Sequence, residues 1–296
     1  MTVRSTCLGR AAEEMLKDAD GYKDLAFYKR ALELYFEVLD ICKITDKTGR
    51  HVDVIIKTAD IYGMIGFCYR EQGEYDMAFE WYYKALDHYN EVISKWHPKM
   101  AAVYAEIGTV YNRIGDYEIA DQWCQKAIDI LEEYQQGFGY ELASAYNAKA
   151  EVCFNYKDYE KVIELSGKVF GITSVRDSRD KDIATAYYNN GCAYRELKRY
   201  EEAVTCLRMA ERGYSGSLGA SNPLTKKATK TIEALVEYLI ENDMCDTVVD
   251  KYYHRANKET PYNYIYRFTK TILSRKKFVT CCEIVLKTEV DKIRDR

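Results

Sequence analysis

The residues most able to do chemistry in this sequence are four histidines and ten cysteines. The histidines are scattered, and no cysteine–histidine pair has the spacing of a zinc site. The adjacent Cys281 and Cys282 could form a redox pair, but Cys281 also fits a packing position. The cysteines form no CxxC pair and no regular framework, which indicates small, reduced, mostly buried side chains. Together with an N-terminus that lacks an apolar signal segment, this favours a cytoplasmic location.

Motifs of catalytic and cofactor-binding sites are missing from the sequence. It contains no GxxxxGK[ST], no GxGxxG after a strand, no HExxH and no GxSxG. We therefore expect no enzymatic activity and no small-molecule cofactor or metal. No run of about 18 apolar residues occurs, so no membrane span is expected. The excess of acidic residues before position 251 argues against nucleic-acid binding.

The elements that must position any binding residue are internal repeats. ADIYGMIGFCYREQGEYDMAFEWYYKAL, from Ala59, aligns without gaps to AAVYAEIGTVYNRIGDYEIADQWCQKAI, from Ala101, 42 positions later. Both contain Y-x2-I-G-x2-Y followed by G-x-Y. The spacing of three and four residues predicts one stripe of a helix. The glycine within the stripe allows a second helix to approach closely, and the next glycine, Gly73, suits a turn with positive φ.

Weaker copies extend the array in both directions. Repeats begin near Ala143 and Ala184, and two more hairpins fit residues 226–255 and 262–290. Residues 11–43 make a degenerate first hairpin with Gly21 in its turn. The three prolines, at positions 98, 223 and 261, lie just before predicted first helices, where proline is tolerated.

The copies resemble the tetratricopeptide repeat. The long period and the connectors WHPKMAAVYAEIGTVY and SNPLTKKATKTIEALVEY resemble the kinesin-light-chain type of this repeat, over roughly residues 55–240. The resemblance implies an all-α protein, an α-solenoid with a right-handed superhelix of about seven antiparallel helix hairpins. Its expected parts are a capping hairpin and connector (1–50), core repeats starting near residues 59, 101, 143 and 184 (51–215), and divergent C-terminal repeats with a basic cap (216–296).

The resemblance also implies that the first helix of each hairpin lines a concave groove. Asparagine side chains there could hold the backbone of an extended peptide, because an amide both donates and accepts hydrogen bonds. Arginine and lysine could hold ligand carboxylates. Asp60, Met64, Phe67 and Glu106 also face this groove in the repeat register. The predicted binding residues are Arg70, Thr109, Asn112, Arg113, Asn147, Glu151, Asn155, Tyr188, Asn189, Arg195, Lys227 and Lys230.

Three functions remain open at this stage. The first is a scaffold or adaptor that binds a partner protein or an extended peptide in the groove. The second is a regulatory sensor that a signalling peptide reshapes. The third is the non-catalytic repeat region of a larger enzyme or regulator, or else an unrecognised enzyme. Residues 251–296 hold 12 Lys and Arg against 5 Asp and Glu, in a chain with a net charge of −4. That basic end could attract an acidic partner or could simply be a solvated helical face.

Overall fold

The structure is a computed structural model that describes residues 9–46, 51–134, 138–173 and 181–242. It divides into two compact units, Met1–Thr229 and Lys230–Arg296. The predicted hairpin at 262–290, the second helix of the hairpin at 226–255, the pair Cys281–Cys282 and the basic segment 251–296 lie outside the described residues. The domain boundaries at residues 50 and 215 stay a prediction.

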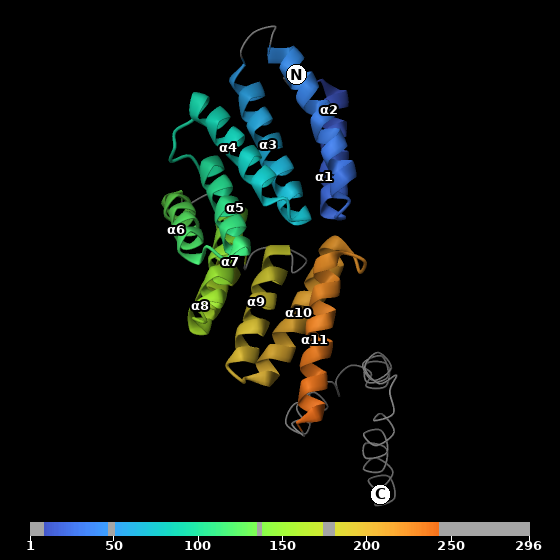
Figure 1. The fold of residues 1–296 in the computed structure, drawn as a ribbon, viewed down its shortest axis with the longest axis vertical. Helices are drawn as coiled ribbons and strands as arrows, with labels where there is room; N and C mark the ends of the chain where they lie inside the picture. Colours follow the sequence, from blue (N-terminus) through green and yellow to red (C-terminus); the bar gives the residue numbers. More distant parts are fainter. Residues whose placement is uncertain (1–8, 47–50, 135–137, 174–180, 243–296) are drawn as a thin grey trace, which may run out of the picture. The chain divides into compact units, whose positions relative to one another are not determined.

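Every regular element among the described residues is an α-helix, and the helices follow one another as antiparallel pairs (Figure 1). This confirms the all-α solenoid of stacked hairpins. The pairs are α1 (Arg10–Asp24) with α2 (Tyr28–Asp46), α3 (Val52–Gln72) with α4 (Tyr75–Val92), α5 (Pro98–Ile114) with α6 (Tyr117–Glu133), α7 (Gly139–Asn155) with α8 (Tyr159–Thr173), and α9 (Lys181–Glu196) with α10 (Tyr200–Leu218), followed by α11 (Pro223–Glu241).

Each hairpin packs on the next mainly through its second helix, which contacts the first helix of the following hairpin, as α2 does with α3, α4 with α5, α6 with α7 and α8 with α9. Helix α5 contacts α7, and α7 contacts α9, in addition to the contacts inside each pair. One continuous core runs through α3 to α9 and is built from alanine, branched aliphatic residues and tyrosine. The fully buried rings of Tyr35 and Tyr82 keep their hydroxyl groups bonded to carboxylates, of Asp20 and Glu106. This use of a buried ring with a bonded hydroxyl accounts for part of the high tyrosine content.

Close helix approach depends on glycine where the sequence predicted it. A Cβ built on Gly108 would lie 2.7 Å from Cys124 Sγ and 3.1 Å from the backbone oxygen of Ala120. A Cβ on Gly66 would lie 2.8 Å from the Tyr82 ring. These distances are shorter than van der Waals contact, so a larger residue would push the two helices of the hairpin apart.

The turns inside the hairpins use the left-handed backbone conformation. Gly73 has φ 82° and Gly115 has φ 96°, as expected for glycine, whereas Lys157 (φ 62°) and Lys198 (φ 59°) occupy the same turn position in later hairpins. The prediction that Gly21 forms the first turn is wrong. Gly21 lies inside α1, where its carbonyl accepts the N–H of Leu25, and the positive φ of 63° falls on Ala26.

Two of the prolines lie at helix starts. Pro98 and Pro223 are the first residues of α5 and α11, so both helices begin at the proline, whereas the sequence predicted that they begin after it. The first helical position has no N–H partner inside the helix, so proline loses nothing there. The His97 ring accepts the N–H of Lys99 at 3.2 Å and supports the start of α5.

The described cysteines are free thiols, and four of them are buried: Cys42, Cys68, Cys124 and Cys153. Burial raises the pKa of Cys68 and of Cys124 to about 12, so both stay neutral at physiological pH. None of the described helices is long and apolar enough to cross a membrane.

Candidate functional site

A groove of about 700 Å³ is formed by the first helices of four successive hairpins, with two tyrosines reaching in from α4. We call it the α3–α9 groove. Of the residues that faced the groove in the repeat register, Asp60, Met64, Phe67 and Glu106 line it. Its full lining is Asp60, Gly63, Met64, Phe67, Tyr82, Tyr89, Lys99, Ala102, Val103, Ala105, Glu106, Tyr140, Glu141, Ser144, Lys181 and Asp182.

The twelve predicted binding residues are not among the residues that line this groove. On each first helix they follow the lining residues in sequence: Arg70 comes after Phe67, Thr109 after Glu106, and Asn147 after Ser144. Their role in binding a ligand therefore stays a prediction.

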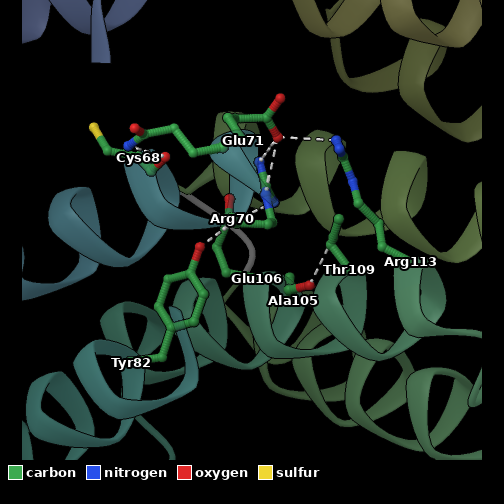
Figure 2. Close-up of polar contacts among 9 residues, drawn as sticks. Cys68, Arg70, Glu71, Tyr82, Ala105, Glu106, Thr109 and Arg113 are labelled. Atoms are coloured by element: carbon green, nitrogen blue, oxygen red, sulfur yellow. Dashed lines mark hydrogen bonds and ion pairs between the residues drawn. The ribbon is translucent and has the colours of Figure 1, made fainter. Parts of the chain in front are cut away.

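Arg70 is the centre of a polar cluster between the second and third hairpins (Figure 2). Its guanidinium forms an ion pair with Glu106 of α5 and another, at 3.0 Å, with Glu71 of its own helix. Glu71 also accepts a hydrogen bond from Arg113 Nη2 at 2.9 Å, and the Tyr82 hydroxyl donates to Glu106 at 3.1 Å. The cluster joins α3 to α5 through charges that balance one another.

Burial and charge act in opposite directions on Arg70. Desolvation alone would lower the pKa of the Arg70 guanidinium, since its side chain is almost fully enclosed. The carboxylates of Glu106 and Glu71 and the Tyr82 phenol outweigh this effect and raise the Arg70 pKa. Burial, then the charge of Glu106, raises the pKa of Tyr82, so its hydroxyl remains a donor. Arg70 is therefore a permanent cation held by its own chain.

A second charged pair lies inside the groove itself. Lys99 Nζ, in the first turn of α5, donates to Asp60 Oδ1 of α3 at 2.7 Å. The hydroxyl of Tyr89 donates to the same carboxylate oxygen. Desolvation and the Asp60 charge raise the pKa of Tyr89. Asp60 thus ties together α3 and α5, the first helices of two successive hairpins, within the groove.

Three of the four asparagines expected to hold a ligand, Asn112, Asn147 and Asn189, are buried, and the first two contact neighbouring repeats. Asn112 Oδ1 accepts a hydrogen bond from Asn155 Nδ2 at 2.7 Å, which links α5 to α7. Asn147 Nδ2 donates to the backbone oxygen of Asp182 at 2.9 Å, which links α7 to α9. Within the described residues, Asn147 Oδ1 and Asn189 Nδ2 are buried atoms that have no hydrogen-bond partner. Unpaired buried amides are costly, so these two atoms require an explanation.

The remaining predicted residues have local contacts. The Thr109 hydroxyl donates to the Ala105 carbonyl at 3.0 Å, and Arg195 Nη2 lies 2.8 Å from Glu196. Lys227 Nζ lies 4.9 Å from the centre of the Tyr188 ring, a cation–π distance. Glu151 is half-buried on α7, and its charge acts on Arg70. Lys230 is exposed on α11 in the second unit.

Sequence reasoning missed the groove residues that come from outside the expected face. Tyr82 and Tyr89 lie on α4, a second helix, whereas the groove was expected to be lined by first helices. Both nonetheless line the groove, and their hydroxyl groups donate to Glu106 and Asp60. Lys99 follows the proline at the helix start, and the register placed it before the repeat began. The sequence did contain a signal for the Lys99–Asp60 pair. Lys99 is a basic residue in the first turn of one repeat, and Asp60 is an acidic residue at the second position of the preceding repeat.

Family models of repeat proteins match two stretches of the chain. A model described as Tetratricopeptide repeat matches residues 57–133, and a second model with the same description matches residues 184–210. The chain contains tetratricopeptide repeats. The matches fall on α3 to α6 and on the α9–α10 hairpin, which confirms the repeat family predicted from the copies beginning at Ala59, Ala101 and Ala184.

Solved structures resemble this arrangement of tetratricopeptide repeats. A Rap protein complexed with Competence and Sporulation Factor is 15% identical, covers 95% of this chain and 88% of its own, and has a TM-score of 0.54. Aspartyl phosphate phosphatase F from Bacillus subtilis is 14% identical over 98% of this chain and 86% of its own, with a TM-score of 0.52. BtubC (BKLC) from P. vanneervenii is 19% identical over 69% of this chain and 79% of its own, with a TM-score of 0.52.

At these sequence identities the similarity shows a shared fold. It does not show that this chain binds the ligands of those proteins. A search of curated protein sequences finds no match to the chain.

Proposed function

We propose that this chain is a non-catalytic protein-interaction module, a scaffold or adaptor, whose α3–α9 groove binds an extended peptide segment of a partner protein. The main support for this proposal is the groove itself, because the first helices of four successive hairpins contribute side chains to it. Its walls leave apolar surface in contact with solvent, because Met64 is 37% and Tyr140 50% exposed. Solenoids of this kind use such extended surfaces for binding.

Several features support a non-catalytic role. Among the described residues, no three His, Cys, Asp or Glu side chains are grouped to hold a metal ion. The most buried thiols have raised pKa values, which is the opposite of an activated nucleophile. The proposal therefore assigns no small-molecule cofactor, and the acidic lining of the groove disfavours nucleic acid. The cytoplasmic location expected from the cysteines belongs to the same proposal.

A second candidate function is a sensor whose repeats change arrangement when a signalling peptide binds. One protein with this fold, the Rap protein, has been crystallised with Competence and Sporulation Factor. Small-angle scattering of this chain with and without a bound peptide separates the two functions. A change in radius of gyration at saturation favours the sensor, and constant dimensions favour the scaffold.

Filling the groove tests the proposed function directly. Ala102 is a half-buried lining residue on α5, and Ala102→Trp places a large ring in the groove. Gln122, on α6, is exposed and lies away from the lining, so Gln122→Trp adds the same ring elsewhere. Partner proteins captured from native lysate by the unmodified chain should be lost with Ala102→Trp and kept with Gln122→Trp. Equal capture by both folded variants would overturn the assignment of the groove.

A further inference from the structure

One face of helix α7 carries polar residues whose bonding capacity is only partly used by the residues that the structure describes. Glu141, Ser144, Asn147 and Glu151 recur at spacings of three and four residues, so they share one side of the helix. Glu141 and Ser144 line the α3–α9 groove, and Asn147 adjoins it through its bond to Asp182, another lining residue. We call these four residues the α7 stripe.

The α7 stripe differs from the rest of the groove in how its charges are balanced. Asp60 is bound by Lys99, and Glu106 by Arg70. Glu141 and Glu151 are half-buried, and neither forms an ion pair or hydrogen bond with any residue that the structure describes. The charge of Glu151 acts on Arg70, but that guanidinium is already paired with Glu106 and Glu71. A partly desolvated carboxylate that forms no ion pair of its own is unfavourable, so a bound cation would stabilise it.

The lining as a whole is also acidic. It contains the four carboxylates of Asp60, Glu106, Glu141 and Asp182 but only two ammonium groups, those of Lys99 and Lys181. Lys181 is exposed at the start of α9, and Lys99 is already paired with Asp60. The arginines that could have attracted an acidic ligand, Arg70 and Arg113, both share Glu71. Charge complementarity with the groove lining therefore favours a positively charged ligand.

Asn147 supplies an independent sign of a missing partner. Its side chain is only 4% exposed, and its Oδ1 accepts no hydrogen bond from any described residue. The Nδ2 of the same amide is fixed by the carbonyl of Asp182, so the acceptor side is held in place. An N–H from a ligand backbone beside the stripe is the kind of donor that this oxygen lacks.

We infer that the α7 stripe selects a basic, extended peptide segment with two Lys or Arg side chains about four or five residues apart. Glu141 and Glu151 are ten positions apart on one helix, which separates them by about 15 Å along its axis. An extended chain covers that distance in about four or five residues. Ser144, between the two acids, is small enough to leave the path open. This inference rests on the proposed function of the groove.

An apolar side chain of the same segment has a place beside the stripe. Met64 and Phe67 of α3 and Tyr140 of α7 line the groove, and Met64 and Tyr140 are left open to solvent. A peptide with one large apolar residue between its two basic residues would fill this surface while its cations meet Glu141 and Glu151. Apolar burial would supply affinity and the charges would supply selectivity.

The test uses the full chain and a library of labelled peptides about ten residues long, each with one Phe or Leu and varied charge. We expect the bound peptides to be enriched in pairs of Lys or Arg four or five positions apart and depleted in Asp and Glu. The double variant Glu141→Lys/Glu151→Lys should weaken the best basic peptide by about tenfold or more and shift selection toward acidic peptides. The matched control Glu118→Lys/Glu133→Lys changes the same charge on exposed positions of α6 and should leave the selection unchanged.

The outcomes separate this inference from the function on which it rests. Peptides that bind the unmodified chain, and are lost with Ala102→Trp, but show no basic preference would overturn the inference and leave the groove function standing. A basic preference that survives charge reversal of the α7 stripe would also overturn it. If no peptide in the library binds the folded chain, both the inference and the proposed function fail. Circular dichroism of each variant establishes that it is folded.

Discussion

Arg70 is a buried cation whose partners come from two hairpins. Its own helix supplies Glu71, and the next hairpin supplies Glu106. The same Glu106 oxygen also accepts the hydroxyl of Tyr82, from α4 of the Arg70 hairpin. Arg113, one repeat later, shares Glu71 but lies on the surface. Both arginines were predicted to belong to the binding groove, and the structure gives them different surroundings.

Substituting the two arginines separates a buried ion pair from an exposed one. Arg70→Ala leaves Glu106 partly enclosed without its cation, so we expect unfolding to become easier by about 3 kcal/mol. Arg113→Ala removes an exposed pair and should cost under about 1 kcal/mol. Urea denaturation of both variants provides the comparison. Equal losses would mean that Arg70 does not hold α3 against α5.

The repeat register predicted the correct face for single residues but not their contacts. Asp60, Met64, Phe67 and Glu106 line the groove as the register indicated. Whether a side chain on that face meets solvent or the next repeat depends on how far neighbouring hairpins are offset. Asn112, for example, reaches Asn155 of the following repeat, 43 positions later. The offset between hairpins is determined by the packing of the whole array, so it cannot be predicted from the sequence of a single repeat.

At the scale of helices and turns, the glycines were the most reliable signal. Gly73 and Gly115 have the positive φ that the G-x-Y motif predicted, and Gly66 and Gly108 lie where a Cβ would collide with the second helix. The same turn position in later repeats is occupied by Lys157 and Lys198. No local signal marks a lysine for this conformation, so only the repeat alignment could have found it.

The turn position can be tested by exchanging residue types. Lys157→Gly should stabilise the chain by about 0.5–1 kcal/mol, because it removes the strain of a left-handed side chain. Gly73→Ala should destabilise it by about 1 kcal/mol through backbone strain alone, since a Cβ there meets nothing within 4 Å. Thermal unfolding of both variants measures the effect. A stabilising Gly73→Ala would contradict the assigned turn geometry.

At the scale of the whole molecule, residues distant in sequence meet within the unit Met1–Thr229. Asn222 Nδ2 donates to the carbonyl of Asp24 at 2.8 Å, and its Oδ1 accepts the N–H of Leu224 at the start of α11. The α3–α9 groove likewise needs residues from Asp60 to Asp182 to be assembled. Repeats predict the stacking that assembles the groove, because each hairpin must bury its apolar face on a neighbour, but they do not predict the contact between Asp24 and Asn222. They do not reveal which charges remain unpaired once the array is complete.

The most direct test of the central claim is photo-crosslinking from matched methionine positions. Met64 lies in the groove and is 37% exposed, and Met209, on α10, is 39% exposed outside it. A photoreactive phenylalanine derivative replaces each methionine in turn in the full chain, and the proteins are irradiated with bound partner in native lysate. We predict a partner adduct from position 64 and none from position 209. Adducts of equal yield from both positions, or from position 209 alone, would contradict binding in the α3–α9 groove.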